Sequence, residues 1–214
     1  QKRHFNFNSS YLGPEFSNDE IEKILKNNKI SYEKLDKRNK ILAKLLSEKN
    51  IIAVFKGKAE FGERALGNRS ILADPRDETM KDKINSIIKY REKYRPFAPS
   101  VIYEESHKYF EVPKNYECFF MEKVIPVKES FRDKLPAITH IDGTARLHTV
   151  KYEHNENFYD LLNEFKKITG FPILLNTSFN TNGEPIVNTP NDALKTFSKS
   201  GLEYLVLNDF LIKK

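Results

Sequence analysis

Residues 56–76 read KGKAEFGERALGNRSILADPR and directly follow an apolar run from Ile51 to Phe55. Five lysines or arginines and three glycines lie within these 21 residues. Glycines let a backbone approach a ligand closely or take positive φ, and arginines present planar sets of donors that match phosphate or carboxylate oxygens. Because ligands of open α/β sheets bind beyond the carboxyl ends of strands, the pattern predicts an anion site at the end of a buried strand.

The spacing of this stretch differs from that of the common phosphate-binding loops. Neither GxxxxGK[ST] nor GxGxxG occurs in the chain, so side chains are expected to hold the anion. Lys58 and Arg64 are the first candidates for phosphate contacts. A single loop cation is usually solvated, but here five cations lie among only three acidic residues. Arg69 is a further candidate, with the alternatives that it caps a helix or pairs with Asp74.

Helical and extended patterns alternate along the chain, which favours an α/β or α+β sheet domain. Ser17 and Glu20 form a capping box for the first helix, and Gly170 is expected to end a later one. Helices are predicted over 17–28, 36–49, 78–89, 158–169 and 189–201. The helices over 36–49 and 78–89 should bury their apolar faces, and the lysines of 78–89 should lie in water. Strands are predicted over 30–32, 51–55, 100–103, 119–127, 138–140, 144–150, 173–175 and 204–207.

Composition limits the class of protein. A chain of 214 residues with 39% hydrophobic content can form one large domain, and we expect a single one. The net charge is +6, of which +4 lies in residues 56–95, so an anionic small ligand explains the surplus as well as nucleic acid does. The lone Cys118 and the absence of a long apolar segment or a signal-peptide pattern predict a cytoplasmic protein.

A second polar cluster follows the apolar run at 173–175. Asn176, Thr177, Ser178 and Asn180 place four short donors and acceptors within five residues, which suits a small planar group such as carbamoyl. A plain turn is the alternative, because Asn and Ser are frequent in turns and an Asn-Gly pair follows at 182–183. We expect this loop to share a pocket with the cationic stretch.

Three further polar features have competing interpretations. Arg91 and Arg95 flank a turn before Pro96, and they either bind the ligand or hold the carboxyl end of a helix. His140 and Asp142 would supply only two metal ligands on one face of a strand, so we expect a hydrogen-bonded core histidine and no metal. No nucleophile with a nearby base can be assigned, which leaves positioning and charge neutralisation as the means of catalysis.

Four blocks of the sequence resemble the C-terminal domain of the carbamoyltransferase family, whose members carbamoylate antibiotics and nodulation factors. These blocks are FGERALGNRSILADPR, INSIIKYREKYRPFAPSVI, THIDGTARLHTV and GFPILLNTSFNTNGEPIVNTP, in the order in which the family has them. The likeness runs from about Tyr11 to Lys214. It implies a YrdC-like fold, a twisted open mixed sheet flanked by helices. Residues 1–10 would then be a linker from a missing N-terminal domain.

The resemblance also implies a reaction. Carbamoyl phosphate would break down to carbamate and phosphate, and the carbamate would attack the α-phosphorus of ATP to give carbamoyl adenylate and pyrophosphate. Lys58, Arg64 and Arg146 match family arginines or lysines on the phosphates, and Ser178 with Asn180 matches a Ser-x-Asn element on the carbamoyl end. Mg²⁺ would accompany ATP, held mainly by its oxygens. Transfer to an acceptor hydroxyl would belong to the N-terminal domain, and the acceptor cannot be read from this sequence.

Two departures from the family pattern adjoin these contacts. Glu63 stands where proline is common and adds a negative charge beside Arg64, and His148 stands where glutamine is common. Two other classes of function stay open, an RNA-binding YrdC-like module and a non-catalytic domain of a larger enzyme. Against RNA binding, no aromatic residues alternate with the cations as a stacking platform. No membrane partner is expected.

Overall fold

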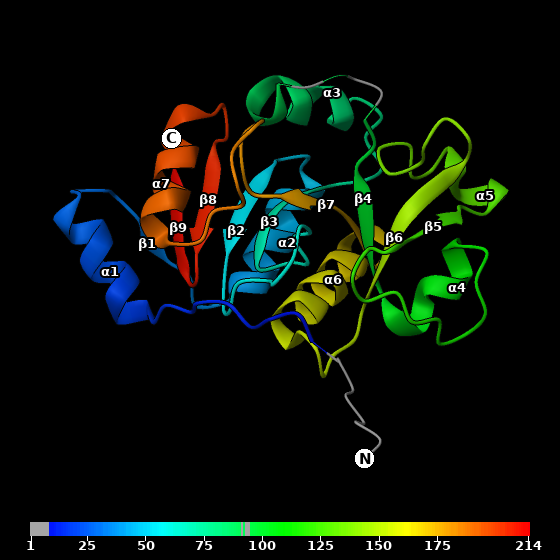
Figure 1. Ribbon diagram of the computed structural model, residues 1–214, viewed down its shortest axis with the longest axis horizontal. Helices are drawn as coiled ribbons and strands as arrows, with labels where there is room; N and C mark the ends of the chain where they lie inside the picture. The colour runs from blue at the N-terminus through cyan, green and yellow to red at the C-terminus, as the bar shows by residue number, and fades with distance from the viewer. Residues whose placement is uncertain (1–8, 91, 93–94) are drawn as a thin grey trace, which may run out of the picture.

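A mixed β-sheet forms the centre of the computed structural model, which describes residues 9–90, 92 and 95–214 (Figure 1). The described strands form one nine-stranded sheet in the order β1-β9-β8-β2-β3-β7-β4-β6-β5. β2 with β8 and β4 with β6 are parallel pairs, and the other neighbours are antiparallel. The strands are β1 (Glu33–Lys34), β2 (Ile52–Phe55), β3 (Arg69–Ala73), β4 (Ala98–Ile102), β5 (Lys123–Pro126), β6 (Thr144–Val150), β7 (Ile173–Ser178), β8 (Tyr204–Leu207) and β9 (Phe210–Lys213).

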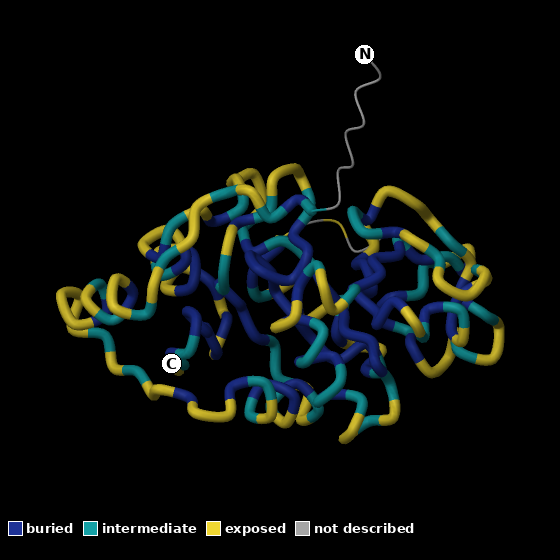
Figure 2. The backbone as a smooth tube through the Cα atoms, turned by 90° about the horizontal axis from the view of Figure 1, so that it is seen from below, coloured by how far each residue is buried: buried dark blue, intermediate teal, exposed yellow. Residues whose placement is uncertain are grey.

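Helices cover both faces of the sheet. One core cluster joins the sheet to α1 (Asn18–Asn27), α3 (Met80–Ile84) with the π-helical turn η1 (Asn85–Lys89), and α7 (Pro190–Lys199). A second cluster joins the opposite face to α2 (Arg38–Ser47) and α6 (Glu156–Thr169), which lie side by side. The short helices α4 (Ser106–Tyr109) and α5 (Glu129–Arg132) lie beside β5 and β6. Figure 2 shows buried segments mainly in the middle of the molecule and exposed segments mainly at its periphery.

Local signals account for the helix ends. The predicted capping box of α1 is confirmed, since the Ser17 hydroxyl accepts from the Glu20 amide and the Glu20 carboxylate accepts from the Ser17 amide. Gly170 ends α6 with a φ of 81°, as the sequence predicts. Thr189 and Asp192 form a second capping box, at the start of α7.

The structure corrects several predicted elements. Residues 69–73, expected in a cationic loop, form the central strand β3, because Ser-Ile-Leu-Ala within them is a short apolar run with partners on both sides. Residues 138–140 form no strand, and the extended segment predicted at 30–32 lies at Glu33–Lys34. β7 continues through Ser178, so Asn176 to Ser178 are strand residues and not loop residues.

The strand directions bring the predicted site segments to one edge of the sheet. β2 and β7 both run antiparallel to β3, so their carboxyl ends lie at the same edge. β4 is antiparallel to β7 and parallel to β6, which places the first residues of both at that edge as well. The 56–68 loop, the end of β7 and the beginning of β6 therefore lie at the same edge of the sheet.

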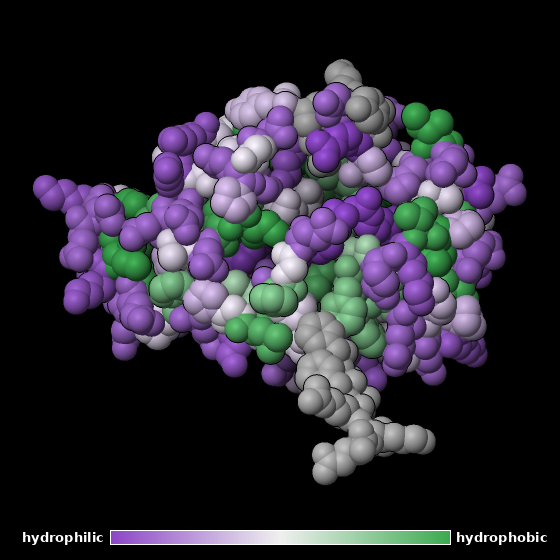
Figure 3. All heavy atoms as spheres, viewed as in Figure 1, coloured by the Kyte–Doolittle hydropathy of each residue, from purple (hydrophilic) through white to green (hydrophobic). Residues whose placement is uncertain are grey.

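Other predictions concern the surface, the cysteine and the chain ends. Hydrophilic side chains cover most of the face in Figure 3, and the hydrophobic ones form separate groups. Cys118 is buried, and burial raises the pKa of its thiol to about 12. None of the helices in the described part of the chain has the length and hydropathy of a membrane span. Residues 1–8 of the expected linker lie outside the described residues, whereas Ser10 is buried against the 56–68 loop.

Candidate active site

The loop between β2 and β3 is fixed from within by a carboxylate. Oε1 of Glu60 accepts hydrogen bonds from the backbone amides of Leu66 and Asn68, both at 2.7 Å, and of Arg69 at 3.2 Å. The Tyr11 hydroxyl donates to the Leu66 carbonyl at 2.9 Å. Burial raises the pKa of Glu60, and the three amides oppose that rise. Glu60 thus ties three backbone amides of this glycine-containing loop to one carboxylate oxygen.

Arg69 is an internal support of the same loop. Its side chain is fully buried, with Cζ 3.5 Å from the centroid of the Phe55 ring. The guanidinium donates to four backbone carbonyls, those of Pro14, Lys56, Gly57 and Asn68. This position argues against the predicted ligand contact. The alternative pairing with Asp74 is wrong, because the Asp74 carboxylate is bound by Arg76 at 2.6 Å.

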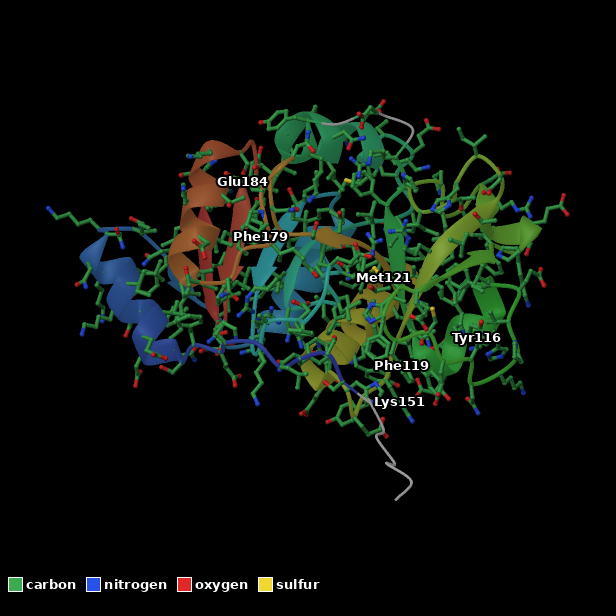
Figure 4. The ribbon with its side chains drawn as sticks, in the orientation of Figure 1. Tyr116, Phe119, Met121, Lys151, Phe179 and Glu184 are labelled. Atoms are coloured by element: carbon green, nitrogen blue, oxygen red, sulfur yellow. The ribbon has the colours of Figure 1, made fainter. Side chains whose placement is uncertain are left out.

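Arg64 and Arg146 line one cavity of about 620 Å³, a size typical of small-molecule sites. Arg64 lies at the tip of the β2–β3 loop, and Arg146 projects from β6. The apolar wall includes Met121, labelled in Figure 4, which packs against Leu66 and Ala98. The remaining lining residues are Ser10, Phe61, Gly62, Glu63, Phe120, Glu122 and Val124.

The electrostatics of this cavity favour an anion. Partial burial lowers the pKa of Arg146, and the nearby positive charge of Arg64 lowers it further, while Glu63 acts in the opposite direction. The two guanidinium groups in this cavity therefore repel each other, and a bound anion would reduce that repulsion. Glu63 forms an ion pair with Arg64 at 3.2 Å, and its side chain is 82% exposed. The Glu63 carboxylate thus partly neutralises the charge of Arg64.

Other predicted cations lie outside the lining of this cavity. Lys58 is exposed on the same loop, where its carbonyl accepts from the Asn68 side chain. Arg95 is exposed and lies 3.9 Å from Glu92. Arg91 lies outside the described residues. The ligand contacts assigned to Lys58, Arg91 and Arg95 stay predictions.

Asn176 belongs to a buried hydrogen-bond chain beneath the cavity. Its Nδ2 donates to the Ala65 carbonyl at 3.1 Å and to the Ser100 hydroxyl at 3.0 Å. Ser100 Oγ lies 2.7 Å from Nδ1 of His148. Asn176 is 1% exposed, and this burial argues against its predicted contact with a carbamoyl group. Thr177, the next predicted contact, is partly buried and pairs with Ile71 of β3.

The end of β7 holds a lysine that the sequence interpretation missed. Nζ of Lys89 donates to the carbonyl oxygens of Ser178 and Asn180 and, at 2.7 Å, to Oδ1 of Asn180. The Ser178 hydroxyl also donates to Oδ1 of Asn180, at 2.7 Å. Lys89 is 4% exposed, so the prediction that the lysines of 78–89 lie in water is wrong for this one. The segment 85–89 is a π-helical turn closed by an i→i+5 hydrogen bond from the Tyr90 amide to the Asn85 carbonyl, so α-helical spacing does not predict which way Lys89 faces.

His140 is held as expected for a structural histidine. Its Nδ1 lies 3.1 Å from the Thr144 hydroxyl, which also donates to Asp142 at 2.7 Å. Burial lowers the pKa of His140. Within the described residues, no three His, Cys, Asp or Glu side chains are grouped to hold a metal ion.

Comparison with known sequences assigns the family. A profile described as "Carbamoyltransferase C-terminus" matches residues 43–214. The chain belongs to this family. It is 49% identical over 95% of its length to the nodulation protein NolNO of Sinorhizobium fredii, and covers 31% of that protein. It is 37% identical over 78% of its length to 3'-hydroxymethylcephem-O-carbamoyltransferase of Amycolatopsis lactamdurans, again covering 31% of the relative.

Solved structures confirm the predicted YrdC-like fold. The chain matches full-length HypF in its phosphate- and nucleotide-bound form with a TM-score of 0.56, at 20% identity. The match covers 82% of this chain and 25% of HypF. A second match, to HypF of T. kodakarensis, has a TM-score of 0.55 at 18% identity. At such identities the likeness shows the fold, and the chain spans about a third of the length of its curated relatives.

Proposed function

We propose that this carbamoyltransferase C-terminal domain binds ATP and carbamoyl phosphate in the cavity of Arg64 and Arg146 and forms carbamoyl adenylate there. The observation that carries the proposal is the convergence of two guanidinium groups from distant parts of the chain on one cavity. Transfer of the carbamoyl group to an acceptor hydroxyl is then the task of a separate N-terminal domain. The curated relatives, about three times longer than this chain, have room for such a domain.

The proposed reaction proceeds in two balanced steps. Water cleaves carbamoyl phosphate to carbamate and inorganic phosphate. A carbamate oxygen then attacks the α-phosphorus of ATP and forms a P–O bond while the bond to the β-phosphate oxygen breaks, releasing pyrophosphate. Negative charge accumulates on the phosphate oxygens, and Arg64 and Arg146 are placed to neutralise it in a partly buried cavity.

Lys89, Ser178 and Asn180 form the second part of the proposed site. They lie at the end of β7, at the sheet edge where the β2–β3 loop and the beginning of β6 also lie. The lysine orders the Ser178 and Asn180 side chains, and its buried charge raises the local positive potential. We assign this cluster to the carbamoyl end, with Ser178 the predicted contact.

Mg²⁺ fits this site as a companion of ATP. Glu63 and Glu122 are the carboxylates that line the cavity, and the described residues offer no grouped set of three metal-binding side chains. The triphosphate oxygens would therefore supply most of the ligands, with water completing the shell. When bound, the ion would offset phosphate charge that the two arginines do not reach.

Calorimetric titration of the 214-residue chain with MgATP tests the proposal. We expect saturable binding that Arg64→Ala and Arg146→Ala each weaken by about tenfold or more, since each removes a charge-assisted contact to phosphate. Lys44→Ala is the matched control, because this lysine is 74% exposed on α2 and lies outside the cavity. Pyrophosphate exchange into ATP that depends on carbamoyl phosphate would identify the adenylate step. Absence of nucleotide binding by the folded chain would refute the assignment.

A titration with RNA, set beside the MgATP titration, distinguishes an RNA-binding module from the proposed nucleotide site. Of the exposed aromatic side chains in the described part of the chain, Phe61 lines the cavity, whereas Tyr90 and Tyr152 do not. This arrangement offers no row of stacking platforms. RNA affinity that falls steeply with salt, together with no response to ATP, would favour the RNA-binding class instead.

A further inference from the structure

A continuous chain of buried hydrogen bonds connects the two arginine-bearing segments. It begins at His148, two residues from Arg146 on the same strand, and passes through the Ser100 hydroxyl at 2.7 Å to the Asn176 amide at 3.0 Å. It ends at the carbonyl of Ala65, 3.1 Å from the Asn176 amide and adjacent to Arg64. The chain thus crosses three neighbouring strands, β6, β4 and β7, before it reaches the loop.

Strand pairing places every member on the same face of the sheet. Ser100 lies directly opposite His148, and Asn176 lies directly opposite Ala98, two residues before Ser100. Side chains two residues apart on a strand share a face, so His148 and Arg146 point to the same side. Phe158 of α6 stacks against the His148 ring, with centroids 6.2 Å apart and the two planes inclined by 26°.

The direction of the hydrogen bonds follows from the donors available. Nδ2 of Asn176 donates one hydrogen to Ala65 and the other to Ser100, so the single Ser100 hydrogen is left for Nδ1 of His148. Nδ1 must then accept, which requires a neutral imidazole with its hydrogen on Nε2. Burial lowers the pKa of His148 to about 3, which keeps the ring neutral. Ser100, with one hydrogen to give, is therefore the member whose loss breaks the chain at its centre.

We propose that His148 and Ser100 are positioning residues for the Arg64 and Arg146 pair, acting through Asn176. The chain of hydrogen bonds sets where the tip of the 56–68 loop lies relative to β6, and hence how far apart the two guanidinium groups are held. None of the three buried side chains lines the cavity, so they act without touching the ligand. The consequence of this role for nucleotide binding rests on the proposed function. The effect of the hydrogen-bond chain on the position of the loop does not.

The test uses two serines of equal burial. Ser100 and Ser106 are both 0% exposed, and the Ser106 hydroxyl donates only to the Tyr103 carbonyl, at the other end of β4. We expect Ser100→Ala to accelerate amide hydrogen exchange in residues 61–66 and to weaken MgATP binding by about tenfold, the scale of one buried hydrogen bond. Ser106→Ala should change neither. His148→Leu should reproduce the Ser100→Ala result, and His148→Gln should restore most of the affinity, because the glutamine carbonyl can accept from Ser100.

A double-mutant cycle separates positioning from general loss of stability. If Ser100 acts through Arg64, Ser100→Ala should weaken MgATP binding much less when Arg64→Ala is already present. Equal loss in both backgrounds, or unchanged exchange in residues 61–66, would overturn the proposal. A wild-type chain that binds no ATP would refute the proposed function, while the exchange experiment would still decide whether the hydrogen-bond chain holds the loop.

Discussion

The Arg69 guanidinium lies over the Phe55 ring, with Cζ 3.5 Å from the ring centroid, inside the loop that carries Arg64 on its surface. Two arginines five residues apart therefore have opposite tasks. Arg69 donates to four backbone carbonyls inside the loop, whereas Arg64 has a side chain that is 38% exposed. Burial lowers the pKa of Arg69 to about 10, yet the group stays charged at neutral pH.

Arg69→Met should destabilise the protein severely. The substitution keeps an apolar contact with Phe55 but removes the donor to the Lys56 and Gly57 carbonyls and one of two donors to the Pro14 and Asn68 carbonyls. Each group left unsatisfied costs about 1–3 kcal/mol. We expect the free energy of unfolding in urea to fall by roughly 3 kcal/mol or more. Arg95→Met, at an exposed position, should change it by less than about 0.5 kcal/mol. Equal effects of the two variants would contradict the structural role of Arg69.

Gly67→Ala should also destabilise the 56–68 loop. Gly67 has a φ of 115°, a conformation that L-residues rarely adopt, and an added Cβ would overlap the Phe158 ring. We expect a loss of about 2–4 kcal/mol in the free energy of unfolding, from strain and overpacking together. Gly62 has a φ of 129°, but no atom lies within 4 Å of an added Cβ. Gly62→Ala should therefore lower the free energy of unfolding by less. The difference between these two variants measures the contribution of the Phe158 contact.

Glu63→Gln tests the charge that departs from the family pattern. The Glu63 carboxylate lies 3.2 Å from Arg64 and competes with a bound phosphate for it. Because both side chains reach solvent, the competition is weak, and we expect MgATP affinity to rise about two- to fivefold at low salt. The gain should shrink as ionic strength rises. Glu48→Gln, a removal of charge at a side chain that is 51% exposed and lies outside the cavity, should leave the affinity unchanged. This comparison presupposes the proposed nucleotide site.

The fold could be predicted from the sequence wherever pattern and capping were local. The capping box of Ser17 and the Gly170 helix end depend on residues within four positions, and both are confirmed. β3 was missed because its strand character depends on hydrogen bonds from β2 and β7, which no local window contains. The density of cations around it suggested a loop, although the Arg69 side chain at its start lies inside the protein.

The candidate site was only partly predictable, for a related reason. Arg64 and Arg146, both assigned to the phosphates, line one cavity. The polar cluster of residues 176–180, which was expected to share a pocket with the cationic loop, does not line this cavity. Sequence cannot show burial, which separates Arg69 from Arg64 and gives Asn176 a supporting position under the loop. Lys89 was missed because its position depends on a π-helical turn. The one usable signal was its place at the end of an otherwise amphipathic pattern, next to Ile88.

His148 should make stability depend on pH below neutrality. Burial, with a smaller contribution from His154, lowers its pKa from 6.5 to about 3 in the folded state. The unfolded chain therefore binds one more proton than the folded chain between these values, so stability is fully present above about pH 6.5 and falls as the pH drops toward 3. The slope attributable to this residue is about 1.4 kcal/mol per pH unit. His148→Gln removes the titrating group, so the difference between the two unfolding free energies, measured in urea from pH 7 to 4, should show that slope. A constant difference across the range would mean that the imidazole titrates normally in the folded protein. Below its pKa the charged ring would then carry a hydrogen on Nδ1 and donate it to Ser100.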